Sequence, residues 1–177
     1  MAGKHVVYWD TSAFLALIIG EDNHGQGVLD ALNSQAGAFD RGDIVLAMSA
    51  VGITEVLSFP LSDEAKTLFE GMIRRSNFQV ISLSENLARR AALLRRHCYQ
   101  TGKASDQENY KLSPPDAIHI ASAMAIKADL LVTLDSRNKP KTKEMAMTQV
   151  TSFYPIADFA SIPVQRPGPG MLGTSMF

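Results

Sequence analysis

The stretch from Ser113 to Asp135 constrains the fold most, because it reads as a buried helix followed by a buried strand. Ser113 is a typical N-cap, and the two prolines after it suit the first helical positions, where a missing N–H costs no hydrogen bond. The helix is predicted to reach about Lys127, and it is apolar on almost every face, as a buried helix is. The unbroken apolar run from Leu130 to Leu134 has the pattern of a strand covered on both faces.

Acidic residues recur at the ends of such apolar elements. Asp116 falls in the first turn of the helix described above, and Asp135 follows the strand. An apolar run at the N-terminus ends in the same way, at Asp10. Glu55 lies about one and a half turns into a helix that follows another apolar run, and its side chain is long enough to reach back toward the end of that strand.

Strands and helices alternate along the chain, which predicts one α/β domain built on a parallel sheet. The predicted strands cover residues 5–9, 44–48, 78–81, 130–134 and 149–153. The predicted helices cover residues 12–19, 26–35, 50–59, 63–75, 85–99 and 114–127. A polar segment over residues 101–112 is predicted as an exposed loop. The domain is predicted to cover residues 1–162, and the Pro/Gly-rich segment 163–177 is predicted to be a mobile tail.

The four acids are expected to meet at one edge of this sheet. In open parallel sheets, ligands bind beyond the carboxyl ends of the strands, so Asp10, Glu55, Asp116 and Asp135 are predicted to converge there. Four carboxylates cannot all stay ionised in one cleft without cations. Oxygen ligands favour a hard ion, so Mg²⁺ or Mn²⁺ is the expected cofactor.

Four motifs in order, DTSAFL, SAVGITEVL, PDAIHIASA and LVTLD, resemble those of PIN-domain ribonucleases. The resemblance covers about residues 6–135 and is greatest to the toxins of bacterial VapBC-type toxin–antitoxin pairs. It implies a PIN-like three-layer α/β/α fold with a central, mostly parallel sheet. The metal-binding acids of that family correspond to Asp10, Glu55, Asp116 and Asp135. The hydroxyls that support the site correspond to Thr11 or Ser12, and to Thr133.

The same resemblance implies hydrolysis of RNA phosphodiester bonds with one or two Mg²⁺ or Mn²⁺ ions, leaving a 5′-phosphate and a 3′-hydroxyl. It also implies a small antitoxin partner, and a homodimer is expected. Phe14 and Leu15 are candidates for the surface that the antitoxin covers, but the sequence does not decide whether they, Leu57 and Phe59 belong to the core or to a dimer or partner surface. Some relatives carry a second Asp where this chain has Asn138, which leaves the number of metal ions open. The basic residues that follow the last acid are candidates for RNA binding: Arg137, Lys139 and Lys141.

Composition narrows the possibilities further. The 177 residues carry a net charge of −1, so any nucleic-acid site must be a local basic patch. The single cysteine, Cys98, excludes an intramolecular disulfide and suits a reducing compartment. The N-terminus does not have the form of a signal peptide, and no apolar run is long enough to span a membrane, so a cytoplasmic location is expected.

Two other functions fit part of the pattern. A phosphatase of the haloacid-dehalogenase type also begins with an Asp after an apolar strand, but it needs a second acid two residues later, where this chain has Ser12. A PIN-like fold could also act as a binding module without catalysis, although the complete set of four acids favours an enzyme. His119 lies three residues after Asp116 and is predicted to be a packed, hydrogen-bonded histidine rather than a metal ligand.

Overall fold

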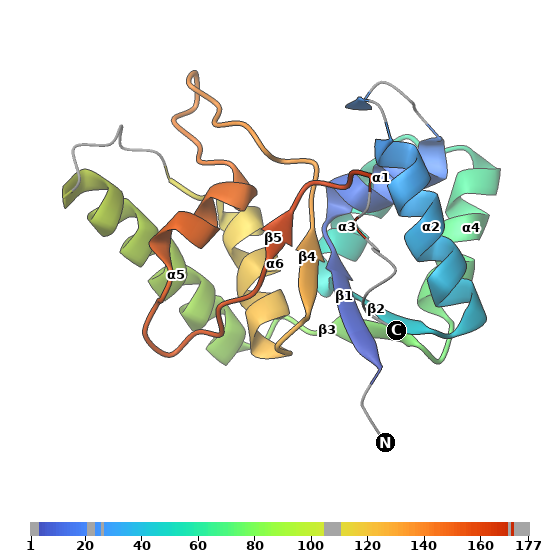
Figure 1. The fold of residues 1–177 in the computed structure, drawn as a ribbon, viewed down its shortest axis with the longest axis horizontal. Coiled ribbons are helices and arrows are strands. Elements are labelled where there is room, and N and C mark those ends of the chain that lie inside the picture. Colours follow the sequence, from blue (N-terminus) through green and yellow to red (C-terminus); the bar gives the residue numbers. More distant parts are fainter. Residues whose placement is uncertain (1–3, 21–23, 26, 105–110, 170, 172–177) are drawn as a thin grey trace.

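The computed structural model describes residues 4–20, 24–25, 27–104, 111–169 and 171. A five-stranded sheet lies at the centre, in the order β3-β2-β1-β4-β5, and every neighbouring pair is parallel (Figure 1). The strands are β1 (His5–Trp9), β2 (Ile44–Ser49), β3 (Phe78–Ile81), β4 (Leu130–Val132) and β5 (Val164–Gln165). The helices are α1 (Thr11–Ile19), α2 (Val28–Arg41), α3 (Ala50–Ser58), α4 (Asp63–Ile73), α5 (Glu85–Ala104) and α6 (Pro114–Ala125), with a 3₁₀ helix, η2, at Met147–Phe153.

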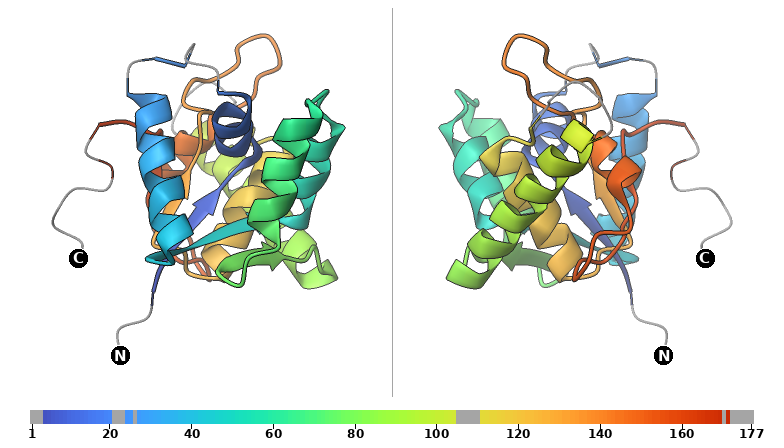
Figure 2. Two further views of the ribbon diagram at one scale, coloured as in Figure 1. Left: turned by 90° about the vertical axis from the view of Figure 1, so that its right-hand side faces the viewer. Right: turned by 90° about the vertical axis from the view of Figure 1, so that its left-hand side faces the viewer.

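Helices cover both faces of the sheet, as the two side views show (Figure 2). Successive residues of a strand point to opposite faces, so β1 contributes Val7 and Trp9 to one core and Tyr8 to the other. The first core packs against α1, α2 and α4, and Phe14 of α1 contacts the ring of Trp9 at 5.0 Å between centroids. The second core packs against α5 and α6. The predicted three-layer α/β/α fold is therefore confirmed.

Polar side chains cap the N-termini of α1, α3 and α6. Asp10 caps α1, and its side chain accepts a hydrogen bond from the N–H of Ala13. Ser49 caps α3, and Ser113 caps α6 with the predicted prolines directly after it. Each cap satisfies an N–H that the first helical turn leaves without a partner, and at α1 and α3 it lets the chain pass directly from a buried strand into a helix.

The predicted strand at residues 149–153 is wrong, because these residues belong to η2. Two hydroxyl groups there donate back to nearby carbonyls, Thr151 to Thr148 and Ser152 to Gln149, which favours a tight turn over an extended chain. The fifth strand is β5, which lies in the segment predicted as a tail. Val164 is buried, so the predicted boundary at residue 162 is wrong for β5.

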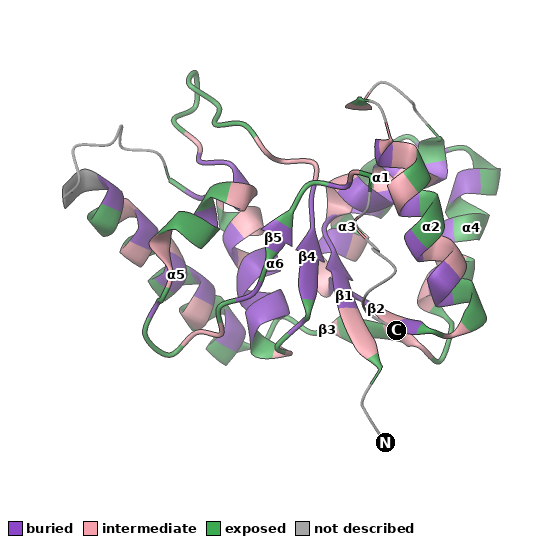
Figure 3. Cartoon of the chain, viewed as in Figure 1, coloured by how far each residue is buried: buried purple, intermediate pink, exposed green. Residues whose placement is uncertain are grey.

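Other element boundaries differ by small amounts. Residues 101–104, predicted to begin a loop, continue α5, and residues 105–110 lie outside the described chain. The helix α6 ends at Ala125, and Lys127, which was predicted to lie in it, has a positive φ of 52°. The residues of β4 and of the inner helix faces are buried, whereas those of the outer helix faces are exposed (Figure 3). No helix in the described ranges is long and apolar enough to span a membrane.

Candidate functional site

Asp10 is held rigidly at the carboxyl end of β1. Its Oδ1 accepts hydrogen bonds from the N–H of Ala13 at 3.0 Å and from the hydroxyl of Ser12 at 2.7 Å. Its Oδ2 accepts a hydrogen bond from the hydroxyl of Thr133 at 2.7 Å. Only 5% of Asp10 is exposed, so its carboxylate has one fixed orientation at this edge of the sheet.

The hydroxyl of Thr133 connects Asp135 to Asp10. Thr133, which donates to Asp10, also accepts a hydrogen bond from the N–H of Asp135 at 3.0 Å. The carboxylate of Asp135 accepts from the N–H of Met147 at 3.3 Å and lies 3.6 Å from the ammonium of Lys139. Thr133 therefore links the acid that follows β1 to the acid that follows β4, at the position predicted for a supporting hydroxyl.

Asp116 reaches the same edge from the first turn of α6. Its N–H donates to the side chain of Ser113 at 3.2 Å, which fixes the start of the helix. Its Oδ2 is buried and has no hydrogen-bond partner among the described residues. A buried carboxylate oxygen without a partner is costly, and a cation or a donor at that position would remove the cost.

These three acids share one electrostatic environment. Burial raises the pKa of each carboxyl above its ordinary value, and this is the largest influence in all three cases. The charge of Asp135 further raises the pKa of Asp116, and the charge of Asp10 further raises the pKa of Asp135. Interactions with His119 lower the pKa values of Asp10 and Asp116, and interactions with Lys139 lower those of Asp116 and Asp135, but they oppose these rises only in part. The described residues thus supply too little positive charge to balance three ionised carboxylates.

Glu55, the fourth predicted acid, lies in a different setting. Its Oε2 accepts hydrogen bonds from the hydroxyl of Thr11 and from Nε2 of His119, the latter at 3.0 Å. The other ring nitrogen of His119 hydrogen-bonds the Tyr8 hydroxyl at 2.9 Å, and that hydroxyl accepts from the N–H of Ser49. The hydrogen bond from His119 lowers the pKa of Glu55, which therefore ionises more readily than usual.

The donor set suits a hard divalent cation, but it does not form a complete ligand cluster. Carboxylate oxygens are the ligands that Mg²⁺ and Mn²⁺ prefer, and the partnerless Oδ2 of Asp116 is such an oxygen. Within the described ranges, no three His, Cys, Asp or Glu side chains lie close enough together to hold a metal ion. The structure brings Asp10, Asp116 and Asp135 into one electrostatic environment without bringing them into ligand contact.

The three predicted RNA-binding residues differ in their surroundings. Lys139 lies 3.6 Å from the carboxylates of both Asp135 and Glu144. Burial opposes its charge, but these carboxylates and Asp116 outweigh burial and raise its pKa. Lys141 is exposed on the loop beyond Lys139, and Arg137 is exposed at the mouth of a pocket beside Asp135.

Several observations add to or correct the sequence prediction. His119 is buried and hydrogen-bonded, as predicted, but its contacts with Tyr8 and Glu55 were not foreseen. Phe14 is completely buried, so the prediction that it belongs to an antitoxin surface is wrong. The side chains of Leu57 and Phe59, which follow Glu55, are 40% and 45% exposed.

Comparison with known proteins agrees with this architecture. The family model described as the PIN domain matches residues 7–143. The solved structure of VapBC2 from Rickettsia felis, bound to a DNA fragment from its promoter, has a TM-score of 0.54 and is 15% identical, covering 91% of this chain and 98% of that chain. VapC20 of Mycobacterium tuberculosis, described as a toxin that cleaves the sarcin–ricin loop, has a TM-score of 0.49 and is 13% identical, covering 88% and 98% of the two chains. No curated protein matches the sequence.

Proposed function

Because the chain belongs to the PIN-domain family, we propose that it is a metal-dependent endoribonuclease and the toxin of a toxin–antitoxin pair. One observation carries this proposal. Asp10, Asp116 and Asp135 are acids from three separate elements, gathered at one edge of the sheet, with raised pKa values and one carboxylate oxygen that has no partner among the described residues. Such a set gains stability when a cation binds and remains strained when none does.

Mg²⁺ or Mn²⁺ is the proposed cofactor, as one ion or two, with Asp10, Asp116 and Asp135 as its ligands and Glu55 as a fourth acid of the site. When bound, such an ion stabilises negative charge on a phosphate and lowers the pKa of a water molecule. The supporting residues fix the orientation of these acids. Thr133 and Ser12 hold the carboxylate of Asp10, which would otherwise rotate.

His119 and Thr11 have the corresponding role for Glu55. An ionised carboxylate only accepts hydrogen bonds, so Nε2 of His119 carries the proton that is shared with Glu55. This bond lowers the pKa of Glu55 and directs one of its oxygens toward α6. Glu55 therefore ionises more readily than Asp10, Asp116 and Asp135, whose pKa values are raised.

The proposed substrate is RNA in the cytoplasm, and the proposed partners are a small antitoxin and a second copy of the chain. The name VapBC2, given to one structural neighbour, supports the choice of a toxin–antitoxin pair. The exposed Leu57 and Phe59 offer an apolar surface close to Glu55 that a partner could cover.

Cleavage of tRNA and other structured RNAs tests this function. The wild-type protein and Asp10→Asn should be compared with Mg²⁺, with Mn²⁺ and with EDTA. Asparagine is also a good N-cap, so this variant should keep the start of α1 while it loses the charge that a cation needs. We expect cleavage by the variant to fall by orders of magnitude, and equal cleavage in EDTA by both proteins would reveal a contaminating nuclease.

Growth measurements test the role as a toxin separately. Expression of the wild-type chain alone should slow growth, and expression of Asp10→Asn should not. If both proteins allow equal growth while the wild-type protein still cleaves RNA, the chain is a nuclease but not a toxin. RNA binding without any metal-dependent cleavage would instead favour a binding module.

A further inference from the structure

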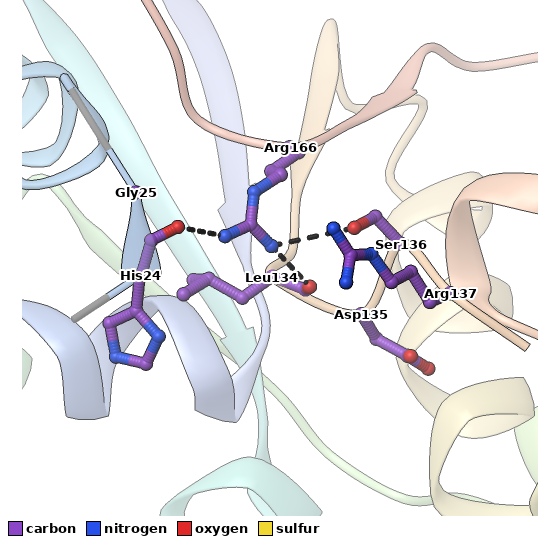
Figure 4. Close-up of a pocket in the computed structure, with 7 residues that line it drawn as sticks. All are labelled: His24, Gly25, Leu134, Asp135, Ser136, Arg137 and Arg166. Carbon is purple, nitrogen blue, oxygen red and sulfur yellow. Dashed lines mark hydrogen bonds between the residues drawn. The ribbon is translucent and has the colours of Figure 1, made fainter. Parts of the chain in front are cut away.

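A pocket of about 550 Å³ is lined on one side by Asp135 (Figure 4). It is formed where three segments meet, and the residues that shape it are His24, Leu134, Asp135, Ser136, Arg137 and Arg166. Its volume falls within the range of about 300–1,000 Å³ that is usual for small-ligand sites. Asp135 belongs both to this pocket and to the group of acids, so the two sites adjoin.

Arg166 holds the walls of this pocket together. Its Nη1 donates to the carbonyl of Leu134 at 2.9 Å and to the hydroxyl of Ser136 at 3.4 Å, and its Nη2 donates to the carbonyl of His24. All three acceptors are neutral, so none of these bonds cancels the charge of the guanidinium. A guanidinium has five N–H donors, so Arg166 retains donors for a ligand after these bonds are made.

Arg137 adds a second guanidinium to the same pocket. It is exposed, and among the described residues no carboxylate forms an ion pair with either arginine. Among the described residues, Asp135 is the only acid that lines the pocket, and it already interacts with Lys139. Two positive groups therefore face one pocket, and an anion bound between them would relieve their repulsion.

We propose that this pocket is a phosphate subsite, in which Arg137 and Arg166 bind the backbone phosphate next to the one that is cleaved in a single strand of RNA. The proposal rests on the proposed function, because it takes the acids as the position of the cleaved phosphate. A strand whose reacting phosphate lies against Asp135 must continue on one side of it, and the pocket offers the complementary charge at that place. Planar guanidinium groups match the paired oxygens of a phosphate better than ammonium groups do.

Binding in EDTA tests the subsite without cleavage. Fluorescence anisotropy with a labelled single-stranded RNA should compare the wild-type protein with Arg137→Ala, Arg137→Lys and Arg74→Ala. Arg74 is an exposed arginine that pairs with Glu70 on α4, so its replacement removes the same charge elsewhere on the surface. We expect Arg137→Ala to weaken binding roughly tenfold, Arg137→Lys to weaken it less, and Arg74→Ala to leave it near the wild-type value.

Two further readouts locate the contact. The slope of log affinity against log salt concentration should fall by about 0.7 in Arg137→Ala, the value for one phosphate contact with a single strand. RNAs that carry one neutral methylphosphonate linkage, placed at each position in turn, should show one position where wild-type binding weakens. In Arg137→Ala, substitution at that position should have no further effect.

The subsite and the nuclease function can fail separately. Equal RNA affinity and equal salt slopes for the wild-type protein and Arg137→Ala would overturn the subsite even if the wild-type protein cleaves RNA. That result is also expected if the pocket binds an acidic protein segment instead. Loss of the position-specific effect in Arg137→Ala would support the subsite even if no RNA tested is cleaved.

Discussion

Nε2 of His119 lies 3.0 Å from Oε2 of Glu55, so a histidine of α6 supports an acid of α3. This contact divides the four acids of the site into two kinds. The pKa of Glu55 is lowered, whereas burial raises the pKa values of Asp10, Asp116 and Asp135. The surroundings of Glu55 thus favour its ionised form, whereas burial disfavours the ionised form of the other three acids.

The position of His119 depends on Gly52. A Cβ at residue 52 would lie 2.9 Å from Cε1 of His119 and 2.9 Å from two side-chain atoms of Met48. We expect Gly52→Ala to lower the free energy of unfolding by about 1–3 kcal/mol, because overpacking a full core outweighs the better helix propensity of alanine. Urea unfolding measures the stability, and NMR titration of Glu55 should show that its pKa returns toward the ordinary value.

Gly71 provides the matched control for this prediction. It also lies in a helix, α4, but an added Cβ there would meet no atom within 4 Å. Gly71→Ala should therefore raise stability by about 0.5–1 kcal/mol, the propensity difference alone. A stabilised Gly52→Ala protein would show that His119 and Met48 move aside freely.

Asp116→Asn should stabilise the metal-free protein in a manner that depends on pH. The pKa of Asp116 is raised in the folded state, so between the unfolded value of about 3.9 and the folded value the folded protein holds more protons. Stability from this group is therefore present at low pH and is lost as pH rises through that window. Melting temperatures in EDTA should show an advantage of the variant that grows with pH and then levels off.

The same variant should respond less to metal. A cation that binds only the folded state raises the melting temperature, and Mn²⁺ at neutral pH should raise it more for the wild-type protein than for Asp116→Asn. An advantage in EDTA that shrinks with rising pH would contradict this account. It would indicate that Asp116 serves mainly as a favourable acid at the start of α6.

Lys139→Ala should tighten the binding of Mn²⁺. The ammonium of Lys139 lies 3.6 Å from the carboxylate of Asp135, where it competes with a cation for the same negative charge. Titration calorimetry should give a severalfold higher affinity for the variant, since Coulomb energies at such distances are about 1 kcal/mol or more. Lys141→Ala is the control, because the exposed Lys141 forms no ion pair with a described carboxylate. An equal increase in Mn²⁺ affinity in both variants would indicate that the net charge of the protein, and not the position of Lys139, sets the affinity.

Val164→Asp should destabilise the fold strongly. Val164 is 5% exposed and pairs with Leu131 of β4, so the variant buries a charge without a partner. We expect a loss of about 3 kcal/mol or more in urea unfolding. Gln165→Asp, on the exposed side of the same strand, should change stability by only about 0.5 kcal/mol. If both substitutions change the free energy of unfolding only slightly, the segment around β5 contributes little to the stability of the fold, as expected of a tail.

The elements around the site were predictable because local signals agree there. Ser113, the two prolines and an apolar run predict α6, and the apolar run that follows predicts β4. The strand β5 was not predicted, because it has only two residues and two residues are too few to show the alternation of a strand. Its position depends on hydrogen bonds with β4, including those from Leu131 N–H to Pro163 and from Thr133 N–H to Gln165, and these exist only once the sheet has formed.

The acids were predictable from their places at the ends of apolar runs, but their partners were not. Which nitrogen of His119 meets Glu55 depends on how closely α3 and α6 pack, and that packing depends on the absence of a side chain at Gly52. Arg166 was missed for another reason. Its contacts join segments that are distant in sequence, and an arginine in a Pro/Gly-rich stretch gives no local sign of such a role.

The place of β1 at the centre of the sheet has a consequence for synthesis on the ribosome. The hydrogen bond between Thr133 and Asp10 joins residues 123 positions apart, and β1 must wait for β4 before its second neighbour exists. Contacts of such long range form late, because the intervening chain must be closed into a loop first. A growing chain therefore exposes Asp10 for most of its synthesis without the acids beside it. The acids can come together only after Asp135 has been made, so the site is completed late in the synthesis of the chain.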